Sequence, residues 1–151
     1  MIVHYVDTSA WVKRYVQERG SAWMATWLSK GPHLACATLG LIEMLCAVSR
    51  KQRAGELSAA RYGVLVEQVE TDYATFAQID LSQDVLAIAR AMPSMYALRG
   101  ADTVHLASAI ALREELAGEA DDVIIVSTAA ELKQAARLAR FRVLDPEESE
   151  R

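Results

Sequence analysis

Three carboxylate side chains stand where the sequence is otherwise apolar. Asp7 follows a short apolar run, Glu43 lies alone inside the uncharged stretch 36–48, and Asp102 opens the apolar segment 103–112. Acidic side chains are rarely buried unless they are paired or bind a metal ion. Clustered carboxylates repel one another and raise each other's pKa values, and a divalent cation removes that conflict. If the fold brings the three together, the pattern indicates a site for a divalent cation.

Each of these side chains also has a purely structural interpretation. Asp7 fits a turn or helix cap, and Asp102 fits a cap for the helix that follows it. Glu43 has no basic residue three or four positions away, so it fits an exposed position on a one-sided helix. His105, one turn after Asp102, is expected either to be structural or to support the site indirectly. The sequence alone leaves these alternatives open.

The residue types favour a hard cation over zinc. Oxygen ligands without a Cys/His set select Mg²⁺ or Mn²⁺. Cys36 and Cys46 lie ten residues apart, a spacing that matches neither a zinc site nor a redox CxxC motif. We expect both to be buried free thiols in a reducing compartment.

Alternating strand and helix patterns predict how these residues are positioned. The predicted strands are 2–6, 33–38, 76–81, 122–127 and 141–144. The predicted helices are 10–17, 21–29, 39–53, 58–74, 82–91, 103–116 and 131–138, with Ser9, Ser58 and Ser82 as caps. This order indicates a parallel α/β sheet with helices on both faces. Ligands of such sheets bind beyond the carboxyl ends of the strands, where Asp7 lies.

Length and composition exclude several classes of protein. The 151 residues fit one domain, and 52% apolar with 24% charged residues is typical of a globular protein. Sixteen basic and twenty acidic residues give a net charge of −4, so binding to nucleic acid by bulk positive charge is not expected. No apolar run is long enough to span a membrane, and the first residues lack a basic signal-peptide region. We therefore expect a cytoplasmic protein that does not contact membranes.

Three segments carry a resemblance to a known family. VDTSAWVK around Asp7, LGLIEML around Glu43 and LRGADTVHLASAI around Asp102 occur in this order and at separations that resemble PIN-domain nucleases. The VapC-type toxins of bacterial and archaeal toxin–antitoxin pairs are the most similar group. The resemblance extends over residues 2–144. It implies a three-layer αβα sandwich with a mostly parallel sheet, here a domain of residues 1–145 followed by a solvated tail, 146–151.

The resemblance also implies a function and its residues. Asp7, Glu43 and Asp102 would form the catalytic acidic centre of a Mg²⁺-dependent endoribonuclease that hydrolyses RNA phosphodiester bonds, with Mn²⁺ as a substitute. Asp7 and Asp102 would ligate the metal, and Glu43 would orient or deprotonate the attacking water. A cognate antitoxin would inhibit the enzyme, and a homodimer is usual among these toxins.

One departure from the family pattern bears on activity. Many relatives carry a fourth acid after the last main strand, where this chain has Ala129. Glu131 follows two residues later and is expected to point elsewhere on its helix. The number of bound metal ions therefore stays open. The alternative to an enzyme is a catalytically silent PIN-like module with a partner-binding groove.

Contacts to substrate are predicted at two places. Ser9 is a candidate for binding the phosphate or a water, although a helix cap is its simpler role. The one basic cluster consists of Arg50, Lys51 and Arg53, which are candidates for binding RNA. The same three residues would also suit the carboxyl end of a helix, whose dipole favours positive charge.

Three tryptophans suggest where a protein partner would bind. Trp23 and Trp27 are four residues apart, and Trp11 lies on the preceding predicted helix. Packing in the core is one interpretation of these rings. The other is an apolar groove that receives an amphipathic antitoxin helix.

Overall fold

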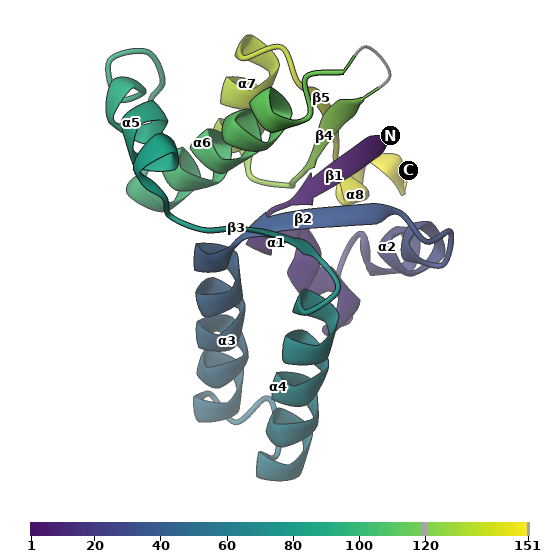
Figure 1. Ribbon diagram of the computed structural model, residues 1–151. Helices are drawn as coiled ribbons and strands as arrows, with labels where there is room; N and C mark the ends of the chain where they lie inside the picture. The colour runs from purple at the N-terminus through teal and green to yellow at the C-terminus, as the bar shows by residue number, and fades with distance from the viewer. Residues whose placement is uncertain (119–120, 151) are drawn as a thin grey trace.

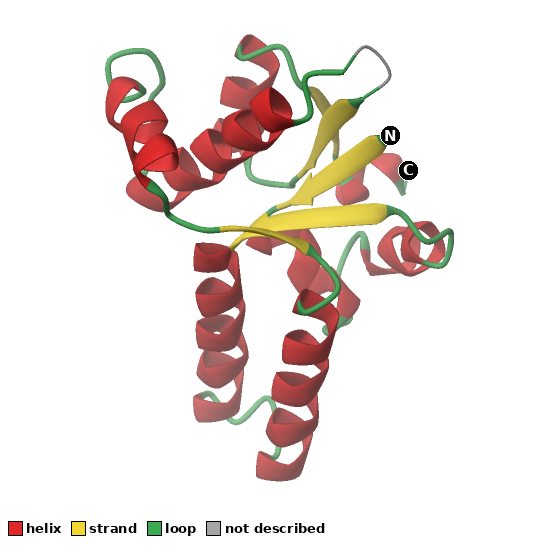
Figure 2. Cartoon of the chain, viewed as in Figure 1, coloured by secondary structure: helices red, strands yellow, loops and turns green. Residues whose placement is uncertain are grey.

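Five parallel strands form the sheet at the centre of the molecule. The computed structural model describes residues 1–118 and 121–150, and its strands follow the order β3-β2-β1-β4-β5. Figure 2 shows them as a twisted layer between helices. Their bounds are β1 Ile2–Val6, β2 His33–Ala37, β3 Ala77–Ile79, β4 Asp122–Val126 and β5 Arg142–Leu144. All pairings are parallel, which confirms the predicted sheet.

Helices cover both faces of this sheet. One face carries α5, α6 and α7, and the other carries the helices that come earlier in the chain (Figure 1). The bounds are α1 Thr8–Trp11, η1 Val12–Arg14, α2 Ser21–Leu28, α3 Thr38–Arg53, α4 Ala59–Tyr73, α5 Gln83–Ala91, α6 Gly100–Glu115, α7 Ala130–Leu138 and α8 Pro146–Ser149. The predicted αβα sandwich is confirmed. Helices α3 and α4 lie side by side and project away from the sheet.

The apolar run of the first strand explains its central position. β1 pairs with β2 on one side and β4 on the other, so its side chains alternate between two cores. Val3 and Tyr5 pack toward α5, α6 and α7. Val6 packs with Trp11 and Met24 on the opposite face. Residues that follow this strand are therefore held between two packed layers.

The first helix differs from the prediction. We expected residues 10–17 to be helical with Ser9 as cap, but α1 begins at Thr8 and the helical turn η1 ends at Arg14. Asp7 is the N-cap, because its carboxylate accepts a hydrogen bond from the Ala10 N–H. The predicted caps Ser58 and Ser82 are confirmed at α4 and α5.

The expected solvated tail is also corrected. Residues 146–149 form α8, which packs near α2, and Pro146 is buried. Lys13 pairs with Glu147, and Lys133 pairs with Glu148. Both lysines have buried stems and also pair outside α8, Lys13 with Glu18 and Lys133 with Asp145, so the carboxylates of α8 add a second partner to each buried ammonium group.

Two further observations concern the described part of the chain. None of the helices there is long and apolar enough to cross a membrane. Both cysteines are free, but only Cys36 is buried and Cys46 is exposed, so the expectation of two buried thiols is half wrong.

Candidate active site

Asp7 is buried at the carboxyl end of β1. Its side chain is 3% exposed, and both carboxylate oxygens accept hydrogen bonds. The Ser9 hydroxyl donates to Oδ1 at 2.7 Å, and the Ser127 hydroxyl donates to Oδ2 at 2.8 Å. Burial raises the pKa of Asp7, while His105 and these two hydroxyls act in the opposite direction. The donors therefore favour the ionised carboxylate in a site that otherwise disfavours charge.

The two serines are themselves fixed by the loop after β4. The Thr128 N–H donates to Ser9 Oγ, and the Ala129 N–H donates to Ser127 Oγ, both at 3.0 Å. Each hydroxyl thus accepts from the backbone and can direct its own proton at Asp7. This network joins the end of β1 to the end of β4. Ser9 supports Asp7 here rather than capping a helix.

Glu43 lies on α3 and finds its partners on other elements. His105 Nε2 lies 2.5 Å from Glu43 Oε1, and Thr8 Oγ1 donates to the same oxygen at 3.0 Å. Burial raises the pKa of Glu43, but the hydrogen bonds and the charge of His105 outweigh it, so that pKa is lowered overall. The side chain keeps 32% of its surface exposed. Glu43 is neither a solvated surface acid nor fully buried.

A close helix approach brings Glu43 within reach of His105. At Gly40, one turn before Glu43, an added Cβ would lie 2.3 Å from Cys36 Sγ and 3.3 Å from His105 Cε1. Only glycine leaves room for this contact between α3, β2 and α6. Gly40 is therefore required for the position of Glu43.

Asp102 lies in the first turn of α6 and lines a cavity. It does not cap that helix, because Arg99 occupies the N-cap position without a side-chain cap bond. The cavity has a volume of about 560 Å³ and is lined by Ala97, Leu98, Arg99, Asp102 and Glu131. Burial raises the pKa of Asp102, with the charges of Glu43 and Glu131 adding to the rise and His105 and Arg99 opposing it. Such an electrostatic environment favours a bound cation.

Glu131 is placed differently from the prediction. We expected it to point elsewhere on its helix, but it lines the same cavity as Asp102 and contributes to the raised pKa of that acid. Ala129 occupies the N-cap position of α7 and supplies only its backbone. The first turn of α7 thus offers an acid to the cavity, two residues after the position where relatives carry one.

The charges of the three predicted acids all act on one buried histidine, and Glu43 contacts it directly. His105 is 2% exposed, and Asp7, Glu43 and Asp102 all act on its charge. Burial lowers the pKa of His105, but the bond to Glu43 and the three negative charges outweigh it and raise that pKa. Asp102 lies one turn before His105 on α6, and Asp7 directly precedes Thr8, which donates to Glu43, so hydrogen bonds through Glu43 link the elements that carry the other two acids.

No ready-made metal cage accompanies this convergence. Among the described residues, no group of three or more His, Cys, Asp or Glu side chains is arranged to hold a metal ion. Carboxylates and hydroxyls predominate among the nearby side-chain groups, together with Arg99, the buried Cys36 thiol and His105, whose two ring nitrogens already have partners.

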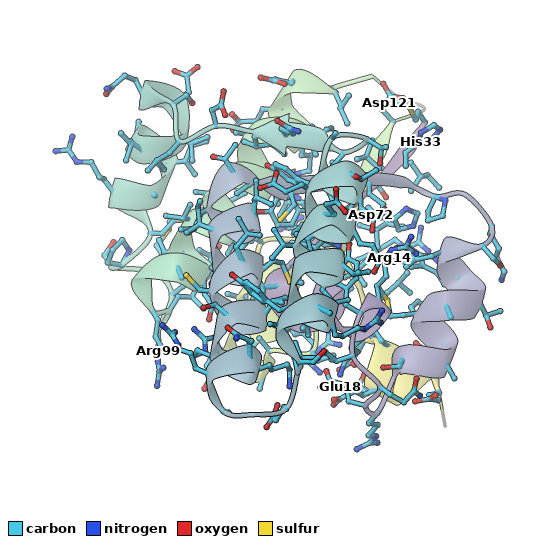
Figure 3. The ribbon with its side chains drawn as sticks, turned by 90° about the horizontal axis from the view of Figure 1, so that it is seen from below. Arg14, Glu18, His33, Asp72, Arg99 and Asp121 are labelled. Atoms are coloured by element: carbon cyan, nitrogen blue, oxygen red, sulfur yellow. The ribbon has the colours of Figure 1, made fainter. Side chains whose placement is uncertain are left out.

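The basic cluster lies away from these acids. Arg50, Lys51 and Arg53 are in the last turns of α3, in the part of the α3–α4 pair that projects from the sheet (Figure 1). At about 1.5 Å per helical residue they lie roughly 10 to 15 Å along the axis from Glu43. Arg99 is closer to the acidic centre. Figure 3 shows it at the margin of the molecule opposite His33 and Asp121, which lie at the amino ends of strands.

The tryptophans belong mainly to the core. Trp11 is buried against Tyr73 and Phe76, and Trp27 is also buried. Trp23 stacks on Trp27 with ring centroids 5.4 Å apart and remains only half-buried. The core interpretation therefore holds for two of the three rings.

Several site residues were not among the predicted ones. Tyr5, Thr8 and Ser127 contact the acids or His105, and Arg99 lines the cavity. The only feature of the sequence that could have pointed to these residues is their position along the chain. Thr8 and Ser127 follow buried strands, as Asp7 does, and strand ends in a parallel sheet share one edge.

Comparisons with known proteins agree with this arrangement. A family model described as PIN domain matches residues 4–126. Ribonuclease VapC47 of Mycobacterium tuberculosis is 30% identical over 116 residues, covering 74% of this chain and 78% of that protein. Ribonuclease VapC45 from the same organism is 33% identical over 109 residues, covering 72% and 75%.

Solved structures share the fold at lower identity. The FitAcB structure from Neisseria gonorrhoeae superposes with a TM-score of 0.68 at 16% identity, covering 97% of this chain and 98% of that one. A toxin–antitoxin complex from Klebsiella pneumoniae gives a TM-score of 0.65 at 16% identity, with 95% and 97% coverage. The family match spans most of the chain and includes all three acidic motifs in full. The chain belongs to the PIN-domain family.

Proposed function

We propose that this protein is a Mg²⁺-dependent endoribonuclease that hydrolyses RNA phosphodiester bonds. The observation that carries the proposal is the hydrogen bonding of Glu43 to Thr8, which follows Asp7, and to His105, which lies one turn after Asp102. Membership of the PIN-domain family and relatives named ribonuclease VapC support it.

The donor set fits a hard divalent cation. Mg²⁺ is commonly held by one or two carboxylates and keeps several waters, so it needs no cage of three side chains. Asp7 and Asp102 are the proposed ligands, with Mn²⁺ as a substitute. The raised pKa values of both carboxyl groups fit this assignment, because burial and neighbouring acids leave negative charge that a cation would compensate.

Glu43 is proposed as the general base. When bound, Mg²⁺ would polarise the phosphate and neutralise the charge that develops on it. A lone pair of the attacking water forms the new P–O bond, and the proton of that water passes to the Glu43 carboxylate. The bond from phosphorus to the leaving ribose oxygen breaks, and that oxygen keeps the electron pair and takes a proton from solvent. The lowered pKa of Glu43 keeps it ionised and ready to accept a proton at neutral pH.

RNA contacts are proposed on both sides of the acidic centre. Arg99 lines the cavity beside Asp102, where it faces the phosphate nearest the scissile bond. Arg50, Lys51 and Arg53 would bind phosphates several nucleotides further along the strand. Ser9 holds Asp7 and lies close enough to the site to contact substrate as well.

We further propose that the protein is the toxin of a toxin–antitoxin pair in the cytoplasm, inhibited by its antitoxin and forming a homodimer. Among the structural neighbours are FitAcB and a toxin–antitoxin complex, which supports an antitoxin partner. The half-buried Trp23, stacked on Trp27, is the aromatic surface proposed for an antitoxin helix.

A catalytically silent PIN-like binding module is the second candidate. Ala129 favours it, because this position lacks the acid that many relatives carry. The position of Glu131 in the cavity beside Asp102 counts against it.

A cleavage assay separates the two candidates. The purified chain, free of any partner, is incubated with single-stranded RNA and Mg²⁺, Mn²⁺ or EDTA. The ribonuclease hypothesis predicts cleavage with either metal, none in EDTA, and loss of activity in Asp7→Asn with the fold retained by circular dichroism. Absence of metal-dependent cleavage under all conditions would support the binding module. Full activity in Asp7→Asn would remove Asp7 from the site.

A further inference from the structure

A hydrogen-bonded chain of buried groups ends on one oxygen of Glu43. The Ala37 N–H donates to Tyr5 Oη at 3.1 Å, and Tyr5 Oη lies 2.7 Å from His105 Nδ1. His105 Nε2 then reaches Glu43 Oε1. The path therefore crosses β2, β1 and α6 before it arrives at α3. Tyr5 and His105 are both buried, so packing restricts their side chains.

The direction of the bond to Glu43 follows from the partners. Burial raises the pKa of Tyr5 well above its usual value, so the phenol keeps its proton. Since Tyr5 already accepts from Ala37, it can donate to His105 Nδ1, which places the imidazole proton on Nε2. A charged imidazolium also carries a proton on Nε2. In either state His105 donates to the ionised Glu43.

The two carboxylate oxygens of Glu43 differ in their hydrogen-bond partners. Oε1 accepts from His105 and from Thr8, whereas Oε2 has no hydrogen-bond partner among the described residues. The side chain is partly exposed, so Oε2 is the oxygen left for a water. A carboxylate fixed through one oxygen presents the other at a defined place and angle, which is what a general base requires.

We propose that His105, held by Tyr5, is a positioning residue that orients Glu43 so that Oε2 faces the attacking water. This rests on the proposed ribonuclease function. His105 acts through Glu43 and does not itself touch the substrate. Gly40 is part of the same arrangement, because a side chain there would press on the imidazole ring.

Replacing His105 with either of two amide residues, glutamine or asparagine, provides a matched test of its positioning role. The amide nitrogen of His105→Gln is the same number of bonds from Cβ as Nε2 of histidine and can donate to Glu43. The amide of His105→Asn is one atom shorter and cannot. We expect His105→Asn to lower kcat for Mg²⁺-dependent RNA cleavage by about 100-fold with KM nearly unchanged. We expect His105→Gln to recover a large part of kcat, although both variants lose a buried imidazole.

A second readout does not depend on activity. The pKa of Glu43, followed by carboxyl carbon NMR in the absence of metal, should rise in His105→Asn and rise less in His105→Gln. Equal kcat and equal Glu43 pKa in the two variants, at matched folded fractions measured by thermal unfolding, would overturn the proposal. So would wild-type kcat in His105→Asn.

The two hypotheses fail in different ways. If the wild-type chain cleaves no RNA, the ribonuclease function is wrong and His105 cannot position a base for that reaction. The NMR comparison still decides whether His105 fixes Glu43. If the wild-type chain cleaves RNA but the two amides behave alike, the ribonuclease function stands and only the role of His105 is wrong.

Discussion

Replacing Ser127 with alanine should expose how strongly the site depends on hydroxyl donors to Asp7. Ser127 is fully buried, donates to Asp7 Oδ2 at 2.8 Å and accepts from the Ala129 N–H at 3.0 Å. Ser127→Ala removes a bond to a charged acceptor and leaves a backbone donor without its partner. Bonds to charged groups contribute about 1.5 to 3 kcal/mol, so we expect a loss of roughly 2 to 3 kcal/mol in the free energy of unfolding. For a chain of this size that corresponds to a fall in Tm of roughly 5 to 10 °C.

The loss of folding stability in Ser127→Ala should depend on pH in a direction that follows from the pKa of Asp7. Burial raises the pKa of Asp7, and the Ser127 hydroxyl opposes the rise, so the pKa in Ser127→Ala is higher still. A raised carboxyl pKa destabilises the folded state above that pKa, and the effect disappears as the pH falls and the group is protonated in both states. The stability difference between wild type and Ser127→Ala should therefore be largest at neutral pH and shrink in acid.

A second buried serine serves as the control for this experiment. The Ser108 hydroxyl donates to the Val104 carbonyl one turn earlier on α6. Ser108→Ala should cost about 1 kcal/mol, the value typical of a neutral bond, with little dependence on pH. Urea unfolding in EDTA at neutral and mildly acidic pH compares the two. Equal losses in both variants at neutral pH, without a pH effect in Ser127→Ala, would refute the reasoning.

Three further predictions test other parts of the molecule. Arg99→Gln should raise KM for RNA and reduce the dependence of KM on salt more than Arg53→Gln does, because Arg99 lines the cavity; equal effects in steady-state assays would contradict its placement. Ala129→Asp should lower the Mg²⁺ concentration for half-maximal cleavage several-fold, by adding an acid at the N-cap of α7; an unchanged metal titration would argue against a role for that position. Deleting residues 146–151 should lower the free energy of unfolding by about 2 kcal/mol, because the packing of Pro146 is lost and each of two buried lysines loses one of its two carboxylate partners. Urea unfolding with no change in midpoint would show that α8 does not contribute.

Patterns local in the sequence predicted most of the fold. The apolar runs of β1 and β4 are long and uncharged enough to identify buried parallel strands, and Ser58 and Ser82 mark helix starts. The tail was misjudged for a physical reason. The charged residues 146–151 are typical of a solvated end, and the pairing of Glu147 with Lys13, 134 residues away, leaves no signal in the local sequence.

The site was predictable in its acids but not in its contacts. Asp7, Glu43 and Asp102 are predicted as site residues because a charged side chain within an apolar sequence needs a partner, and this assignment stays a prediction. The partner of Glu43 comes from a helix 62 residues later, and no periodicity on α3 could reveal it. The position of Glu131 depends on how the first turn of α7 meets the cavity, which residue spacing does not specify.

Binding of Mg²⁺ to the chain tests the central claim most directly. Calorimetric titration of the wild type, Asp7→Asn and Asp102→Asn is compared with Asp84→Asn, which alters an exposed acid of α5 outside the acidic centre. If the three acids form a metal centre, the wild type and Asp84→Asn should bind Mg²⁺ with similar affinity. The affinity of Asp7→Asn and of Asp102→Asn should be lower by at least about tenfold. Equal Mg²⁺ affinity in all four proteins, or no binding in any, would contradict it.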